Sequence, residues 1–409
     1  MVNQTINTAS ASATPASSRI HPIVSRLRRS SLAAIAALLC ACVSQPSGPP
    51  ALQYVQWRAS AFSDLPGWAA DRLEDAWQPL VAGCSVLLVR TTASPGWRDV
   101  CTAAAREADN AAAARAFFEE HFTAYELRTA DGVTSALITG YYEPLLHGSR
   151  KRDERYGFPL YAPPDDLLTI DLSATQPQLA DKRLRGRLDG NRIVPYWTRA
   201  DIDAGKASTA GKELFYVDDP LDAFFLHVQG SGRVELPDRS RVRIGYADQN
   251  GWPYRSVGRV LVDRGELSLE SVSMQGIRQW AQEHPQALPA LLAENPSYVF
   301  FREVVPDQSA AIDGPIGTLG VPLQAGRAIA VDARFIPLGA PVLVATTWPS
   351  SGLPLNRLML AQDTGGAIRG PLRADFFWGF GADAEREAGR MKQEGKMWLL
   401  WPKGETPPR

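Results

Sequence analysis

The segment that decides the fold runs Leu358-Met359-Leu360-Ala361-Gln362-Asp363-Thr364-Gly365-Gly366. It joins a short apolar run, typical of a buried strand, to a carboxylate and a glycine-rich turn. Two further aspartates have similar surroundings: Asp332 follows the apolar run Ala328–Val331, and Asp375 precedes Phe376-Phe377-Trp378. A carboxylate beside a buried strand is costly unless it is hydrogen-bonded or used in chemistry, so these three aspartates are the candidate site residues.

Asp375 has the surroundings of a general acid. The three aromatic residues that follow it supply apolar bulk, and desolvation raises the pKa of a carboxylic acid. Raising an Asp pKa from about 3.9 to 6 costs on the order of 3 kcal/mol, which one buried, aromatic-lined position can supply. Arg373 lies two residues earlier on the same strand face, so it lowers the pKa unless its side chain turns away.

The other two aspartates are interpreted differently. Asp332 precedes the turn Ile336-Pro337-Leu338-Gly339, and we expect it to accept backbone N–H groups there in a structural role. For Asp363, a supporting role at the site and a purely structural role are equally open.

The pattern along the chain is mainly β, with helices at the periphery. It predicts strands at residues 134–142, 214–217, 223–229, 233–236, 241–246, 298–301, 328–331, 342–345, 358–361 and 397–401. It predicts helices at residues 101–127 with a break at Asp109-Asn110, at 274–283 with Ser273 as N-cap, at 288–293 and at 384–393. A length of 409 residues favours two domains.

Composition excludes some classes of function. Charged residues make up 21% and nearly cancel to a net charge of −1, which argues against a nucleic-acid partner. The five histidines are scattered and no CxxC or HExxH occurs, so we predict no metal and no cofactor. Cys84 and Cys101 would remain after removal of the N-terminal targeting signal described next. In an exported chain a disulfide between them is favoured over two buried thiols.

The N-terminus carries a targeting signal. Basic residues 26–29 precede the apolar run 32–39, which is too short to span a bilayer core of roughly 30 Å, and then Cys40-Ala41-Cys42. We predict a lipoprotein signal peptide over 1–41, acylation of Cys42, and a flexible tether over 42–52. An ordinary secretory signal is the alternative. Val43 after the cysteine favours the periplasmic face of the outer membrane.

Several segments together resemble the membrane-bound lytic murein transglycosylase A family. Those that carry the resemblance are Thr139-Gly140-Tyr141-Tyr142-Glu143-Pro144, residues 225–232, residues 245–251, Ser273-Met274-Gln275-Gly276-Ile277, residues 295–298 and residues 362–370 with the three aspartates. The resemblance covers nearly everything after the tether. It implies a double-psi β-barrel (53–142 plus 306–403), an inserted second β-barrel domain (143–305), and a substrate groove between them.

The same resemblance implies the chemistry. The catalytic residue falls on Asp375, with Asp363 as its neighbour. The expected reaction is endo- or exo-acting cleavage of the β-1,4 bond between N-acetylmuramic acid and N-acetylglucosamine in peptidoglycan, giving 1,6-anhydromuramyl ends. One carboxyl group suffices because the nucleophile is the sugar's own 6-hydroxyl, whereas ordinary glycoside hydrolases use two.

Seven residues have the side-chain chemistry of a sugar groove, namely rings to stack on and polar groups to bond hydroxyls. They are Tyr141, Tyr142, Gln229, Tyr246, Asp248, Asn250 and Trp252, of which about half are expected to be structural. Two rival functions stay open: a peptidoglycan hydrolase on the same fold, and an expansin-like protein that binds wall without cutting it.

Overall fold

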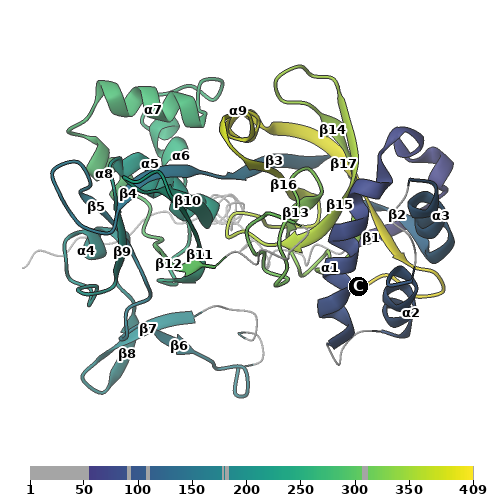
Figure 1. Ribbon diagram of the computed structural model, residues 1–409, viewed down its shortest axis with the longest axis horizontal. Coiled ribbons are helices and arrows are strands. Elements are labelled where there is room, and N and C mark those ends of the chain that lie inside the picture. The colour runs from purple at the N-terminus through teal and green to yellow at the C-terminus, as the bar shows by residue number, and fades with distance from the viewer. Residues whose placement is uncertain are drawn as a thin grey trace, which may run out of the picture. The chain divides into compact units, whose positions relative to one another are not determined.

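The described part of the chain is mixed α/β with more strand than helix. The computed structural model describes residues 55–89, 94–106, 111–176, 179, 184–305 and 312–408 (Figure 1). The predicted signal peptide, Cys42 and the tether lie outside these residues, as does the predicted break at 109–110.

The largest sheet collects strands from both ends of the described chain. Its eight strands run in the order β1-β2-β17-β14-β15-β13-β16-β3, and β17 also pairs with β3. The bounds are β1 Val55–Ser60, β2 Phe122–Thr129, β3 Ala136–Glu143, β13 Ala328–Val331, β14 Pro341–Thr347, β15 Pro354–Asp363, β16 Arg373–Phe380 and β17 Lys392–Pro402. The β17–β3 pairing completes a cycle of six hydrogen-bonded strands, β3-β16-β13-β15-β14-β17.

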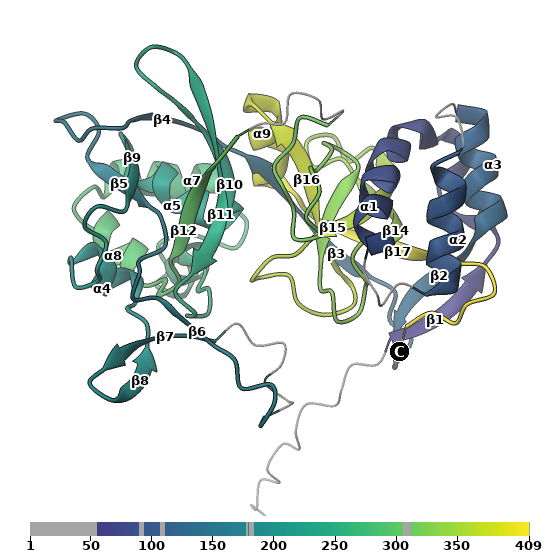
Figure 2. The same ribbon diagram turned by 60° about the horizontal axis from the view of Figure 1, so that its bottom comes forward.

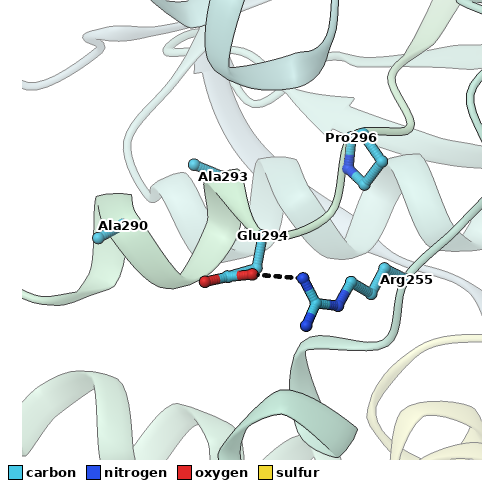
Figure 3. A pocket seen from close by; sticks show the side chains of 5 residues that line it. All are labelled: Arg255, Ala290, Ala293, Glu294 and Pro296. Atoms are coloured by element: carbon cyan, nitrogen blue, oxygen red, sulfur yellow. Dashed lines mark hydrogen bonds and ion pairs between the residues drawn. The ribbon is translucent and has the colours of Figure 1, made fainter. Parts of the chain in front are cut away.

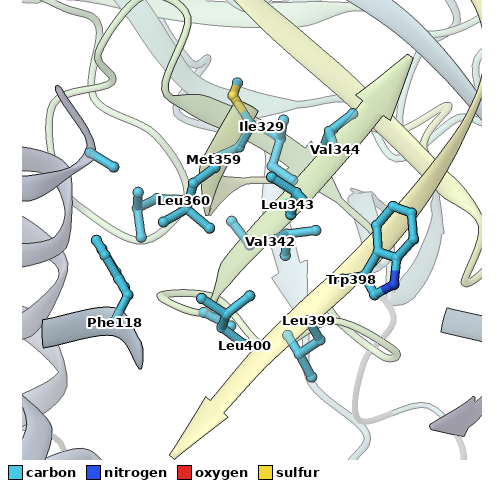
Figure 4. Close-up of a cluster of buried hydrophobic side chains, with 14 of the residues drawn as sticks. Phe118, Ile329, Val342, Leu343, Val344, Met359, Leu360, Trp398, Leu399 and Leu400 are labelled. Carbon is cyan, nitrogen blue, oxygen red and sulfur yellow. The ribbon is translucent and has the colours of Figure 1, made fainter. Parts of the chain in front are cut away.

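The strands of this cycle are apolar on both faces, which explains their continuous hydrophobic runs. Val342 and Leu343 are adjacent on β14 and point to opposite faces, yet both are fully buried. They belong to one large cluster of buried side chains, part of which is drawn in Figure 4. Phe118 of a covering helix packs in the same cluster, so one face of the strands is shielded by helices.

The N-terminal helices provide that cover and lie together beside the eight-stranded sheet (Figure 2). They are the 3₁₀ helices η1 Phe62–Asp64, η2 Trp68–Ala70 and η3 Leu73–Ala76, and the α-helices α1 Trp77–Val89, α2 Pro95–Ala104 and α3 Ala111–His121. A disulfide joins Cys84 of α1 to Cys101 of α2, with the Cα atoms 5.1 Å apart. This is the pairing that the sequence favoured.

The described residues between β3 and β13 form two further sheets and five helices. A six-stranded sheet has the order β12-β11-β10-β4-β9-β5, and a three-stranded sheet the order β6-β7-β8. The strand bounds are β4 Leu145–Ser149, β5 Phe158–Tyr161, β6 Leu168–Ile170, β7 Leu184–Asp189, β8 Arg192–Pro195, β9 Glu213–Val217, β10 Ser231–Glu235, β11 Arg241–Gln249 and β12 Val299–Val304. The helices are α4 Arg199–Asp203, α5 Pro220–Gln229, α6 Val257–Asp263, α7 Met274–Glu283 and α8 Leu288–Ala293, with α9 Ala382–Arg390 following β16.

Two secondary-structure predictions are wrong. Residues 223–229 are not a strand but the end of α5, which Asp219 caps by accepting the N–H groups of Leu221 and Asp222, and which Gly230 ends in the left-handed conformation. The aspartate cap, Pro220 at the first helical position and the closing glycine are helix signals that outweigh the apolar run. The predicted helix 101–127 ends at His121, because β2 begins at Phe122 and pairs with β1 and β17.

The disulfide should contribute measurably to stability. Replacing both Cys84 and Cys101 by alanine opens a loop with a sequence separation of 17 residues. We expect the free energy of unfolding to fall by about 3 kcal/mol, because the unfolded chain regains the entropy that the crosslink removes. Thermal unfolding of the chain without its signal and with Cys42 replaced measures this. Reductant should lower the midpoint of the parent and leave the double variant unchanged; equal midpoints without reductant would contradict the prediction.

Candidate active site

A β-bulge at Gln362 brings two of the three aspartates to the same face of the sheet. Ile329 of β13 pairs with Ala361 of β15, but the next residue, Ala330, pairs with Asp363 instead of Gln362. On its other side, Ala330 pairs with Asp375 of β16. Because directly paired residues point to the same face, Asp363 and Asp375 flank the small side chain of Ala330.

The row continues onto β3, where Asp375 pairs with Thr139. Thr139, Asp375, Ala330 and Asp363 therefore lie side by side across four strands. Two strand spacings of about 4.8 Å each separate the backbones of the two aspartates. This row, called the aspartate row below, brings together residues far apart in sequence.

Asp375 accepts a short hydrogen bond from the Thr139 hydroxyl at its Oδ1 atom. Burial raises the pKa of Asp375, and the nearby Asp363 charge raises it further, against the lowering effects of the Thr139 hydrogen bond and the Arg373 charge. Arg373 turns toward β3 and donates to Thr139 Oγ1 at 2.7 Å, without forming an ion pair with Asp375. Arg373 has therefore not turned away from Asp375, and its charge still lowers the pKa of that carboxyl group, but burial outweighs it and the pKa is raised.

The expected aromatic lining of Asp375 is only partly right. Phe377 lies two residues along the strand, on the face of Asp375, in a small buried cluster with Tyr141 and Ala330. Phe376 points to the opposite face and packs in the main core, where Trp378 also makes contact. Strand alternation separates the two sets, so of the three aromatic residues that follow Asp375 only Phe377 shares its face.

Asp363 is held by three donors. The Tyr141 hydroxyl donates to its Oδ2 at 3.1 Å, and the Thr318 N–H and hydroxyl donate to its Oδ1 at 3.0 and 2.9 Å. Burial raises the pKa of Asp363, while these hydrogen bonds lower it. Tyr141, predicted to contact sugar, is thus placed at the aspartates, and its own pKa is raised well above normal by burial and by both carboxylates.

Asp332 lies in a different setting: its contacts fit the expected structural role, but the partners of its carboxylate are Arg334 and Gly370 and not the turn Ile336-Pro337-Leu338-Gly339. Its carboxylate accepts from Arg334 Nε at 2.9 Å and from the Gly370 N–H at 2.8 Å. Burial opposes ionisation, but these bonds outweigh it and lower the pKa of Asp332. It therefore fixes the loop between Asp363 and Asp375 in a structural role.

Sequence comparison places this arrangement in a known family. Residues 137–302 match the MltA specific insert domain, and residues 327–401 match the 3D domain. Membrane-bound lytic murein transglycosylase A of Escherichia coli K12 is 34% identical over 284 residues, which cover 68% of this chain and 68% of that protein. The chain belongs to the membrane-bound lytic murein transglycosylase A family.

Two solved structures of enzymes named MltA are similar to the structure of this chain. MltA of Neisseria gonorrhoeae is 39% identical, with a TM-score of 0.75 over 89% of this chain and 97% of that one. Escherichia coli MltA with bound chitohexaose is 27% identical, with a TM-score of 0.62 over 89% of this chain and 100% of that one. The curated relative in Vibrio cholerae is 32% identical over 286 residues, 68% of each chain. As a member of the MltA family, the protein is a lytic murein transglycosylase, an enzyme.

The other predicted groove residues lie on β3, at the end of α5, on β11 and in the residues that follow β11. Asp248 pairs with Arg185 at 2.9 Å, and the Trp252 indole donates to the Tyr196 carbonyl at 2.7 Å. Tyr246 is a partly buried residue of β11 beside the core of the six-stranded sheet. Tyr142 donates its N–H to Gln229 Oε1 at 3.1 Å, which ties β3 to the end of α5.

The Asn250 side chain forms hydrogen bonds with backbone groups. Its side-chain amide donates to the carbonyls of Trp197 and Pro296 at 2.9 and 2.8 Å and accepts the Tyr298 N–H at 2.8 Å. The residue is 1% exposed. These contacts favour a structural role over the predicted contact with sugar.

Two polar residues at the site escaped the sequence interpretation. Thr139 and Thr318 donate to the two aspartates, yet threonine is too common in strands and turns to stand out. Thr139 opens the segment Thr139-Gly140-Tyr141-Tyr142, which carried the resemblance to the MltA family, and that was the available signal.

A shallow pocket elsewhere contains none of the predicted residues. Arg255, Ala290, Ala293, Glu294 and Pro296 line it, and an Arg255–Glu294 ion pair of 2.6 Å crosses it (Figure 3). It is thus separate from the aspartate row. Among the described residues, no helix is both long enough and apolar enough to cross a membrane.

The raised pKa of Asp375 predicts a pH-dependent cost to stability. Below its unfolded pKa the carboxyl is neutral in both states; as pH rises above that value the unfolded chain ionises freely, whereas burial resists ionisation in the fold. We expect Asp375→Asn to raise the unfolding midpoint at neutral pH, with the gain disappearing in acid. Urea unfolding of both proteins across pH measures this, and a gain independent of pH would contradict it.

Asp332→Asn is the matched control with the opposite sign. The lowered pKa of Asp332 gives stability that is present above the unfolded pKa and lost as pH falls through the folded one. We expect this variant to lose roughly 1–3 kcal/mol at neutral pH, since charge-assisted hydrogen bonds are removed, and to approach the parent in acid.

Asn250→Ala separates a structural role from a role in sugar binding. We expect a loss of roughly 2–4 kcal/mol in the free energy of unfolding, because three backbone groups lose their buried partners. KM for glycan should stay unchanged below the unfolding temperature. A large rise in KM with unchanged stability would return Asn250 to the sugar-binding set.

Proposed function

We propose that this protein cleaves the β-1,4 bond between N-acetylmuramic acid and N-acetylglucosamine in peptidoglycan, and that Asp375 is its single acid and base. The observation that carries the proposal is the placement of Asp375 in an enzyme of the MltA family: a carboxyl whose pKa burial raises, beside a second carboxylate. A raised pKa keeps a proton available for donation near neutral pH.

The reaction balances with one carboxyl group and no water. Asp375 donates its proton to the glycosidic oxygen as the bond from that oxygen to C1 breaks. The resulting carboxylate takes the proton of the muramyl 6-hydroxyl while that oxygen bonds to C1. Asp375 ends protonated, and the product carries a 1,6-anhydromuramyl end, since proximity makes the intramolecular hydroxyl an efficient nucleophile.

Asp363 supports this chemistry as a fixed neighbour. It receives three donors, whereas Asp375 receives one, so the proton that the pair holds resides preferentially on Asp375. The same donors occupy both oxygens of Asp363, which makes it a weak base for activating water. This favours the transglycosylase over a hydrolase that uses both carboxylates.

The glycan would lie in a groove between two β domains. We propose that 53–142 and 306–403 form a double-psi β-barrel, for which the cycle of six strands with parallel β13–β15 and β16–β3 pairs is the support. Residues 143–305 would be the inserted β-barrel domain. Chitohexaose, an oligosaccharide, is bound in the Escherichia coli relative, and Tyr141, Tyr142, Gln229, Tyr246, Asp248 and Trp252 are the proposed contacts here.

We place the enzyme at the periplasmic face of the outer membrane through acylated Cys42. The support is the signal sequence and the membrane-bound character in the relatives' name. No cofactor is required, because the two proton transfers use only the carboxyl group and the substrate.

Asp375→Asn tests the proposal directly. The variant keeps the shape of the side chain but cannot exchange a proton, so we expect release of soluble muropeptides from purified peptidoglycan to fall by at least about 10³-fold, to background. Mass spectrometry of the parent's products should show anhydromuramyl ends, lighter by one water than reducing ends. Asp332→Asn, whose role is structural, is the comparison variant.

The outcomes separate the alternatives. Cleavage by Asp375→Asn at the parent's rate would remove Asp375 from the mechanism. Reducing ends from the parent would indicate a hydrolase, and retention on sacculi without any fragments would indicate a binding protein.

A further inference from the structure

The Thr139 hydroxyl lies between the Arg373 guanidinium and the carboxyl group of Asp375, the proposed acid. Its Oγ1 lies 2.7 Å from Arg373 Nη2 and also bonds Asp375 Oδ1. A guanidinium has donors only, so the threonine oxygen accepts from Arg373. The single hydroxyl proton is then free to go to Asp375 Oδ1, and no other acceptor for it is found among the described residues.

Arg373 is itself fixed in place. Its Nη1 donates to the carbonyls of Ala374 at 2.7 Å and Leu137 at 3.2 Å, on the two strands that carry Asp375 and Thr139. Thr139 is held as well, because β3 pairs with β16 on one side and with β17 on the other. The strands therefore fix where the two side chains lie, and the donor-only guanidinium sets which group donates in each hydrogen bond.

We propose that Thr139 and Arg373 are positioning residues that reserve Oδ1 of Asp375 as an acceptor and leave the catalytic proton on Oδ2. The proposal rests on the proposed role of Asp375. A carboxyl proton on Oδ1 would have to point at a threonine oxygen already bonded to a cation, and the Thr139 proton would lose its acceptor. With the proton on Oδ2, the Thr139 hydroxyl keeps Oδ1 as its acceptor and Arg373 keeps the Thr139 oxygen as its acceptor.

The pair also acts in the second half of the reaction. Once Asp375 has given up its proton, the Thr139 hydroxyl still donates to Oδ1, and the positive charge of Arg373 lies one hydroxyl away. Oδ2 is then the oxygen that takes the proton of the 6-hydroxyl. One oxygen thus serves both transfers while the other is held, and the carboxyl need not rotate between them.

Thr139→Val and Arg373→Met test the proposal. Valine keeps the shape of threonine without its hydroxyl, and we expect kcat on glycan to fall about tenfold to a hundredfold, as for loss of a hydrogen bond to a charged group. KM should stay within about twofold of the parent, since a positioning residue does not hold the substrate. Thr139→Ser, which keeps the hydroxyl, should recover most of kcat.

The pH profile gives a readout that a structural role would not move. The Thr139 donor and the Arg373 charge both lower the pKa of Asp375, so removing either raises it. The alkaline limb of kcat/KM, where the acid loses its proton, should shift to higher pH in both variants. Thr346→Val is the matched control: this buried threonine donates to the Glu394 carbonyl at 2.8 Å and should change stability alone.

Each outcome decides a separate question. Parent-like kcat and an unmoved alkaline limb in Thr139→Val, with Asp375→Asn inactive, overturn this proposal and leave the role of Asp375 intact. Activity in Asp375→Asn overturns the proposed function itself. If Thr139→Val does not fold, Arg373→Met decides: an unshifted limb overturns the proposal, and a shifted one supports it.

Discussion

The site depends on the β-bulge at Gln362. Gln362 is fully buried, and its side-chain N–H donates to the Pro79 carbonyl of α1 at 2.7 Å. The Gln362 carbonyl also accepts the Leu319 N–H at 3.0 Å, so side chain and backbone of the bulged residue are both held, and the bulge turns Asp363 to the face that carries Asp375. Without the bulge, regular strand alternation would pair Gln362 with Ala330 and point Asp363 to the opposite face. Because the disulfide ties α1 to α2, the helical layer acts as the support of the aspartate row.

Burial has opposite net outcomes for the pKa values of the three aspartates. At Asp375 and Asp363 burial is incompletely compensated, and their pKa values rise. At Asp332 an arginine and a backbone N–H outweigh burial, and the pKa falls. The Asp332 carboxylate bonds Gly370 and so holds the loop that joins Asp363 to Asp375.

The sequence predicted the elements whose signals are local. Helices α7 and α8 and strand β13 begin and end where periodicity and the Ser273 cap placed them. It failed where a cap competed with an apolar run, at α5, and where aromatic residues continued past a helix into a strand, at Phe122. The partners of the aspartates were beyond reach, because register across strands far apart in sequence decides which threonine meets which carboxylate.

Strand β3 links the aspartate row to residues 144–302, which fall within the match to the MltA specific insert domain and are called the inserted segment here. On one face it carries Thr139 and Tyr141, which bond the two aspartates. On the other, Gly140 lies so close to α9 that a Cβ there would come within 3.0 Å of the Ala388 Cα, and Tyr142 bonds Gln229 of α5. The strand ends at Glu143, a buried carboxylate paired with Arg233 and Arg243 of the inserted segment at 2.8 Å each. A shift of the inserted segment along β3 would therefore also displace the donors that orient Asp375 and Asp363.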